Sequence, residues 1–134
     1  MSQENVELVR GGYERWNREG TASVLDWLDP ELEIETSIGL FDADPVYRGH
    51  AGVRRLLGRF WDEFDEARVD VRECVPVGED FVLVGVHYYG VGKSSGLEFN
   101  LDGWQVWTVR NGKAVRWQLF DDRTEALEAV GLRE

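Results

Sequence analysis

The sequence predicts an α+β domain, with helices mainly in its first half and a largely antiparallel sheet in its second half. Most of the first half carries apolar side chains at three- and four-residue steps, as amphipathic helices do. From residue 69 onward the chain instead runs through four strand-like segments that are separated by short turns. Strands joined by short turns pair antiparallel, so these segments are expected to form one sheet. The 134 residues show no repeat or linker, and residues 1–134 are expected to fold as a single domain.

Two helices are expected before the first strand. Residues 2–20 form the first, because apolar side chains recur at helical spacing and Gly20 ends the run. Its apolar face consists of Val6, Val9, Tyr13 and Trp16. A shorter helix over residues 21–28 is capped by Thr21 and ends at Asp29-Pro30.

One strand and a third helix follow. Residues 31–38 alternate between apolar and polar side chains, which is typical of a half-buried strand. A loop rich in Gly, Asp and Pro covers residues 39–48. Beyond Gly49 the sequence predicts the clearest helix of the chain. Its apolar stripe consists of Val53, Leu56, Leu57, Phe60, Trp61 and Phe64.

The remaining strands are expected at residues 69–77, 81–91, 97–109 and 114–121. Asn111-Gly112 is a strong signal for a tight hairpin turn between the last two. A closing helix is expected at residues 122–130, where Asp122 and Glu125 have the spacing of a capping box.

The composition argues against several classes of function. The net charge is −11, from 26 acidic and 15 basic residues, and such a surface repels nucleic acid and anionic membranes. One cysteine, Cys74, and two isolated histidines provide no disulfide and no metal-site signal. The N-terminal segment lacks a signal-peptide hydrophobic region, and no apolar run has membrane-spanning length, so a cytoplasmic protein is expected.

Several strands carry apolar side chains on both faces. Trp104 and Val106 lie opposite Trp107 and Val109, for example. The helices of the chain can cover one face of the sheet, and a second subunit is the simplest cover for the other. A homodimer through the sheet is therefore expected.

Three stretches of this sequence together resemble the SnoaL-like family of the nuclear transport factor 2-like superfamily. They are Tyr47-Arg48-Gly49-His50, the hairpin QVWTVRNGK at residues 105–113, and the ending DRTEAL at residues 122–127 with Gly131-Leu132. The resemblance covers essentially the whole chain. It implies a curved antiparallel sheet wrapped around helices into a cone, with an apolar pocket that holds a small hydrophobic molecule. Members with known chemistry use acid/base side chains in the pocket without a metal or cofactor.

Steroid-isomerase relatives share part of this pattern. They carry a tyrosine seven residues before the glycine that closes the first helix, as Tyr13 precedes Gly20 here. Their general base corresponds to Thr36, which cannot accept a proton in that role, and their second acid corresponds to about Gln105. The resemblance therefore argues against the isomerase mechanism.

Polyketide-cyclase relatives place an aspartate at the end of the last strand, four residues after a tryptophan. Trp117 and Asp121 have this spacing, and strand alternation puts both on the face that also carries Leu119. Asp121 is therefore predicted to be the acid/base and Asp122 the helix cap, although a bulge in the strand would exchange the two.

The leading hypothesis is a cofactor-free isomerase, cyclase or dehydratase that acts on polyketide- or steroid-like molecules. Asp121 would transfer the proton, while Tyr13 and Gln105 would polarise or orient an oxygen. The predicted ligand-binding walls consist of Trp16, Trp27, Thr36, Phe60, Trp107, Trp117 and Leu119. The first alternative is a non-catalytic ligand-binding or dimerisation module. The second is an epoxide-hydrolase-like Asp–Arg–Asp arrangement with Arg116 or Arg123, although strand alternation puts Arg116 on the face opposite Asp121.

Overall fold

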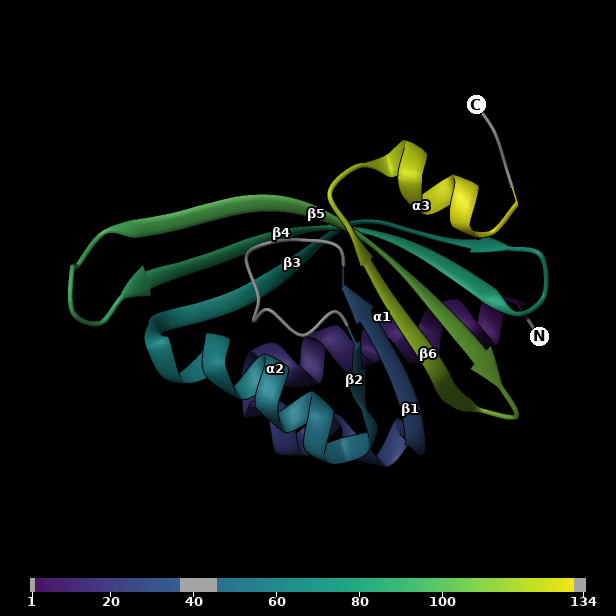
Figure 1. Ribbon diagram of the computed structural model, residues 1–134, viewed down its shortest axis with the longest axis horizontal. Helices are drawn as coiled ribbons and strands as arrows, with labels where there is room; N and C mark the ends of the chain where they lie inside the picture. Colours follow the sequence, from purple (N-terminus) through teal and green to yellow (C-terminus); the bar gives the residue numbers. More distant parts are fainter. Residues whose placement is uncertain (1, 37–45, 132–134) are drawn as a thin grey trace.

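The computed structural model describes residues 2–36 and 46–131, and it describes their side chains apart from those of residues 2, 21, 22, 46 and 59–61. The chain folds into helices packed against one curved sheet (Figure 1). The elements in chain order are α1 (Ser2–Glu19), the 3₁₀ helix η1 (Thr21–Trp27), β1 (Leu28–Thr36), β2 (Val46–Arg48), α2 (Gly49–Glu63), β3 (Phe64–Val77), β4 (Phe81–Gly92), β5 (Glu98–Arg110), β6 (Lys113–Phe120) and α3 (Arg123–Ala129).

The described strands form one mixed sheet in the order β2-β1-β6-β5-β4-β3. The antiparallel pairing of β3, β4, β5 and β6 confirms the expectation from the sequence. In contrast, β1 pairs parallel with β6, through Ile34 opposite Trp117 and Thr36 opposite Leu119. This parallel pairing joins the first and last strands and brings the N-terminal elements against the end of the sheet.

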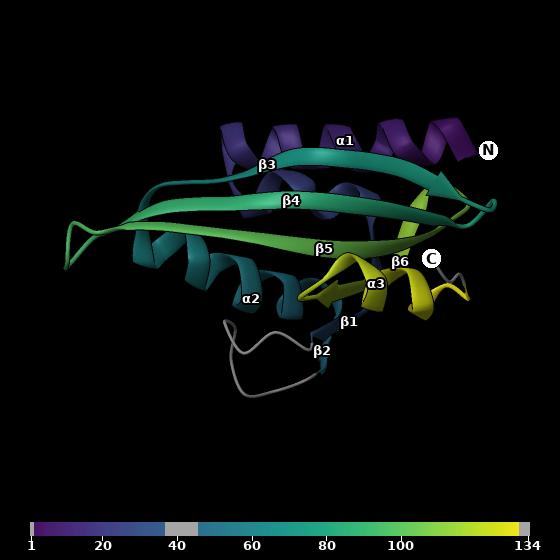
Figure 2. The same cartoon turned by 90° about the horizontal axis from the view of Figure 1, so that it is seen from above.

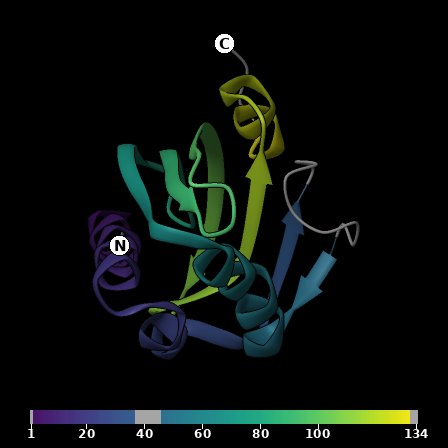
Figure 3. The ribbon, with the colours of Figure 1, turned by 90° about the vertical axis from the view of Figure 1, so that its left-hand side faces the viewer.

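The sheet curves around three helical elements and remains open. Seen from one end (Figure 3), α1, η1 and α2 lie along the concave side of the sheet, and α3 lies on the convex side. We call the concave side the inner face and the convex side the outer face. Most of the hydrophobic core lies between the inner face and the helices, and it includes Val9, Leu32, Val53 and Val84. The predicted α+β cone is thus confirmed.

Three local expectations were wrong. Residues 21–27 form a 3₁₀ helix, and the strand that follows begins at Leu28 and includes Pro30. Residues 46–48 were expected in a loop, but they pair antiparallel with Glu33–Glu35 of β1 as the short strand β2. Phe64 was assigned to the third helix, yet it begins β3, where its ring packs 5.2 Å from that of Phe99.

The turn between β5 and β6 has the conformation that its sequence predicts. Asn111 and Gly112 have φ angles of 52° and 74°, as a two-residue hairpin turn with both central residues in the left-handed region requires. This turn sets the register in which Trp107 lies opposite Trp117.

The outer face is covered by the chain's own last helix at one end. Ala126 and Leu127 of α3 pack with Leu83 and Val106 in a second small core. Half-buried apolar residues around this core are Val77, Phe81, Trp104, Phe120 and Val130. Figure 2, in which α3 lies over part of the long strands, shows that much of the outer face extends beyond the helix.

Beyond α3 the outer face carries hydrogen-bonded polar side chains. The ring nitrogens of His87 lie 2.7 Å from Asp102 Oδ1 and 2.8 Å from Asn100 Oδ1. The hydrogen bonds to Asp102 and Asn100 raise the pKa of His87 above its usual value. The guanidinium of Arg68 lies 4.2 Å from the centre of the Tyr89 ring. This part of the outer face is therefore more polar than expected from the sequence, which predicted strands with apolar side chains on both faces.

None of the helices in the described ranges has both the length and the apolarity needed to cross a lipid bilayer.

Candidate functional site

A cavity of about 40 Å³ lies between α1, η1 and the inner face of the sheet. Helical spacing directs Gly12, Tyr13 and Trp16 of α1 toward the sheet, and strand alternation directs Gln105 and Trp107 of β5 toward the helix. The other described residues in its wall are Val24, Trp27, Leu28, Leu57, Val69, Tyr88, Trp117 and Leu119. The volume is sufficient for roughly three water molecules, at ~10–15 Å³ for each.

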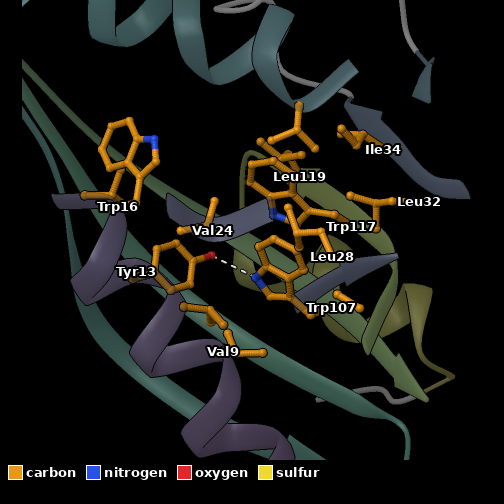
Figure 4. Packing of buried hydrophobic residues seen from close by; sticks show 14 of the residues in the cluster. Val9, Tyr13, Trp16, Val24, Leu28, Leu32, Ile34, Trp107, Trp117 and Leu119 are labelled. Atoms are coloured by element: carbon orange, nitrogen blue, oxygen red, sulfur yellow. Dashed lines mark hydrogen bonds between the residues drawn. The ribbon is translucent and has the colours of Figure 1, made fainter. Parts of the chain in front are cut away.

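Five buried side chains in this wall form one hydrogen-bonded network. The Tyr13 hydroxyl donates to Gln105 Oε1, which also accepts a 2.8 Å hydrogen bond from Trp117 Nε1. Trp107 Nε1 donates to the Tyr13 hydroxyl over 2.9 Å, as the dashed line in Figure 4 shows. Gln105 Nε2 donates to the hydroxyl of Tyr88.

The two indoles determine the direction of every hydrogen bond in this network. An indole N–H donates and cannot accept, so Trp117 must face the carbonyl oxygen of the Gln105 amide. For the same reason the Tyr13 hydroxyl accepts from Trp107, and its own hydrogen is then directed at Gln105. The amide orientation and the Tyr13 proton position therefore follow from chemistry.

Aromatic packing holds these donors in place. The rings of Trp107 and Trp117 stack with centroids 4.6 Å apart and an interplanar angle of 9°. The ring centroid of Trp27 lies 4.9 Å from that of Trp107, with the two planes tilted by 46°. Tyr13 meets Trp107 edge-on at 6.2 Å. Offset and edge-to-face contacts of this kind stabilise aromatic clusters beyond the area that they bury.

Gly12 allows α1 to approach the aromatic cluster closely. A Cβ at this position would lie 2.6 Å from Cε2 and 2.8 Å from Nε1 of Trp27. Because no real side chain tolerates such separations, the absence of a Cβ is what lets the Trp27 indole lie against the helix.

The hydroxyls in the cavity wall are neutral at physiological pH. Burial raises the pKa of Tyr13 well above its usual value, and burial also raises the pKa of Tyr88. None of the described side chains that line the cavity is a carboxylate, an imidazole or a cation. The described wall can therefore donate hydrogen bonds and polarise an oxygen, but it contains no group suited to abstracting a proton near pH 7.

The structure brings together most of the residues that the sequence singled out. Tyr13 and Gln105 are hydrogen-bonded, and the cavity wall also contains Trp16, Trp27, Trp107, Trp117 and Leu119. Thr36 is buried on the inner face beside Leu119 but does not line the cavity. The side chain of Phe60 lies outside the described part of the structure.

The prediction that Asp121 faces the pocket is wrong. Strand β6 ends at Phe120, and the chain leaves the sheet before the alternation of Trp117 and Leu119 can continue to Asp121. Asp121 is exposed in the bend that precedes α3 and is not part of the cavity wall. Its proposed role as the acid/base loses its structural basis.

Asp122 has the predicted capping geometry. Its Oδ1 accepts a 2.8 Å hydrogen bond from the backbone N–H of Glu125 at the start of α3. We expect Asp122→Ala to lower the free energy of unfolding by about 0.5–2 kcal/mol, because that N–H loses its acceptor. Asp121→Asn should change it by less than about 0.5 kcal/mol. Urea denaturation compares the two variants, and an equal loss in both would contradict this division of roles.

The residues of the epoxide-hydrolase-like alternative do not meet either. Arg116 pairs with Glu35, and Arg123 pairs with Glu73 over 3.1 Å. Neither arginine belongs to the cavity wall, and Asp121 is exposed. Within the described ranges, no group of three or more His, Cys, Asp or Glu side chains is placed to hold a metal ion.

Tyr88 and Gly12 were not recognised from the sequence. Tyr88 shares its face of β4 with Val82, Val84 and Val86, and this period of two was the available signal. Its contact with Gln105 depends on the register between β4 and β5, which no local pattern reveals. Gly12 follows Gly11 within a helical run, and nothing local distinguishes the two.

Comparison with known proteins identifies the family. Residues 9–117 match the SnoaL-like domain. The chain belongs to the SnoaL-like domain family. No match is found among curated proteins.

Solved structures with the same fold cover nearly the whole chain. TerC, co-crystallised with polyporic acid, is 25% identical with a TM-score of 0.74, and the match covers 94% of this chain and 96% of TerC. A candidate SnoaL-like polyketide cyclase from Jannaschia sp. is 15% identical with a TM-score of 0.75, covering 99% and 95%. A protein with a ketosteroid isomerase-like fold from Catenulispora acidiphila, in complex with trimethylamine, is 14% identical with a TM-score of 0.72, covering 94% and 93%. At 14–15% identity, the Jannaschia and Catenulispora proteins show only that this chain has the same fold as they do.

Proposed function

We propose that this SnoaL-like protein binds a small, uncharged and mainly apolar molecule in the cavity between α1, η1 and the inner face. The observation that carries the proposal is the chemistry of the described wall: buried indoles and aliphatic side chains surround a neutral polar network, without an ionised group. Ligand pockets are typically apolar concavities with a few placed polar groups. The co-crystal of TerC with polyporic acid supports the use of this fold for ligand binding.

The size of the cavity limits what enters without rearrangement. Its volume of about 40 Å³ is well below the ~150 Å³ of an engineered apolar cavity that accepts benzene. A ring-sized ligand must therefore displace part of the wall. Leu57 of α2 is the residue to move, because it alone among the described lining side chains is half-buried and the others are buried.

Tryptophan emission provides the test of this proposal. We expect at least one compound from a panel of small neutral ketones, phenols and quinones to change the emission saturably, because Trp27, Trp107 and Trp117 line the cavity. Leu57→Phe should abolish the change by filling the cavity. Leu97→Phe, on an exposed turn residue, is the matched control and should bind as the unmodified protein does. A panel without any saturable response, or an equal response in Leu57→Phe, would reject the proposal.

A second candidate is a cofactor-free enzyme of the isomerase, cyclase or dehydratase type. The hydrogen bond from Tyr13 to Gln105 favours it, because a substrate oxygen that takes the place of Gln105 Oε1 would accept the hydrogen of Tyr13 and be polarised by it. Turnover of any bound compound, lost in Tyr13→Phe while binding remains, would establish this candidate. Turnover that is unchanged in Tyr13→Phe would exclude the role of the network.

We also propose that two copies associate through the outer face. Support comes from the limited cover that α3 provides and from Val75, which is 37% exposed on the outer face. Sedimentation velocity at micromolar concentration should give the mass of a dimer, twice 15.4 kDa. A mass that stays at 15.4 kDa at the highest concentration tested would refute the dimer.

A further inference from the structure

The indole N–H of Trp27 is a buried donor without an acceptor in the described part of the structure. Trp27 is 5% exposed and lines the cavity, and its Nε1 has no hydrogen-bond partner among the described residues. Nε1 itself is covered, in part by Gly12, which also belongs to the cavity wall, so an acceptor reaches this N–H only when the wall opens. A buried donor without an acceptor is rare in native proteins, because it has lost its hydrogen bonds to water without replacement.

The two neighbouring indole N–H groups both have an acceptor, which Trp27 lacks. Trp107 Nε1 donates to Tyr13, and Trp117 Nε1 donates to Gln105. Both acceptor positions of the Gln105 carbonyl oxygen are already occupied, by Tyr13 and by Trp117. The described network therefore has no carbonyl lone pair left for Trp27.

Two other buried side-chain polar atoms in the described part of the chain have no partner, and neither belongs to the cavity. Thr108 Oγ1 lies on β5, and Arg116 Nε belongs to a side chain that pairs with Glu35. Neither residue lines the cavity. Trp27 Nε1 is thus the unpartnered buried donor in the described wall.

We propose that the ligand of this cavity carries an uncharged hydrogen-bond acceptor, of the carbonyl class, that receives the N–H of Trp27. This inference rests on the proposed function and specifies its ligand. A carbonyl oxygen suits the site because it accepts without donating. A carboxylate does not suit it, since the described wall offers no cation and the chain has a net charge of −11.

Two probes of the same shape separate the acceptor from the rest of the ligand. The probes are 2-butanone and 2-methyl-1-butene, which replaces the carbonyl oxygen with a methylene group. Each has five non-hydrogen atoms, so the wall must open, but by less than a ring-sized ligand would require. Binding is followed in ¹⁵N–¹H spectra, where the six tryptophans each contribute one indole signal. Trp27→Phe identifies the Trp27 signal by its loss, and sequential assignment identifies it if this variant does not fold.

The ketone is expected to move the Trp27 indole proton downfield in a saturable way. The alkene should perturb the methyl signals of Val24 and Leu28 in the wall without that shift. Trp27→Phe should lower the affinity for the ketone about three- to tenfold, as expected for the loss of one neutral hydrogen bond. It should change the affinity for the alkene by less than about twofold. Trp104→Phe, on the outer face, is the matched control and should alter neither affinity.

The outcomes distinguish the inference from the proposed function. If both probes perturb the wall but the Trp27 proton does not move, or if Trp27→Phe weakens both equally, the cavity binds ligands and the inference is wrong. If neither probe perturbs the wall, the proposed binding function fails and the inference fails with it.

Discussion

Replacing Gln105 with leucine is expected to lower the free energy of unfolding by about 2–5 kcal/mol. Leucine has a similar size but no polar atoms, so the buried Tyr13 hydroxyl and the Trp117 N–H both lose their acceptor. Each buried donor left without a partner destabilises a protein by about 1–3 kcal/mol. Tyr88 loses the hydrogen bond from the amide as well. Urea denaturation measures the effect, since a domain of this size is expected to unfold in one transition.

Gln118→Leu is the matched control for this change. Gln118 is also buried on a strand, but its side chain makes one 3.3 Å hydrogen bond, to the half-buried Glu35. The control should therefore lose less than about 1.5 kcal/mol. If Gln105→Leu and Gln118→Leu lower the free energy of unfolding equally, the network around Gln105 does not stabilise the protein more than a single hydrogen bond does.

Replacing Gly12 with alanine is expected to destabilise the protein by about 1–3 kcal/mol, which is typical of overpacking. The added Cβ would overlap the Trp27 ring, with 2.6 Å to Cε2 and 2.8 Å to Nε1. This result reverses the usual trend, because alanine is favoured over glycine in a helix by about 1 kcal/mol. Thermal and urea unfolding both report the change.

Gly11→Ala tests the explanation in the neighbouring residue of the same helix. A Cβ at Gly11 would meet no atom within 4 Å, so only the helix preference remains. Gly11→Ala should therefore stabilise the protein by up to about 1 kcal/mol. If Gly11→Ala and Gly12→Ala both stabilise the protein, the close packing of Trp27 against α1 is contradicted.

Much of the fold could be predicted because its signals are local. Helical spacing in α1, the short apolar runs of β4 and β5, and the Asn111-Gly112 turn each act over a few residues. The parallel pairing of β1 with β6 could not be predicted in this way, because it joins segments about 80 residues apart. Likewise, the 3₁₀ and α conformations of a seven-residue segment share too much of their spacing to be distinguished.

The candidate site was predicted in part for the same reason. Tyr13 and Gln105 are polar side chains on apolar faces, and such residues can be recognised from helical spacing in α1 and from strand parity in β5. The directions of their hydrogen bonds depend on Trp107 and Trp117, and hence on strand register. The prediction that Asp121 faces the pocket was wrong because alternation does not reveal at which residue a strand ends. One residue of difference moves this side chain from the pocket to solvent.

The location of the binding site is the central claim, and one titration tests it most directly. The first ligand obtained from the panel is titrated against the unmodified protein, Leu57→Phe and Asp121→Asn. Binding in the described cavity predicts that Leu57→Phe weakens the affinity by about tenfold or more, or about 1.4 kcal/mol. It also predicts that Asp121→Asn binds within twofold of the unmodified protein. Loss of binding in Asp121→Asn, together with full binding in Leu57→Phe, would contradict the claim and return the site to the end of β6.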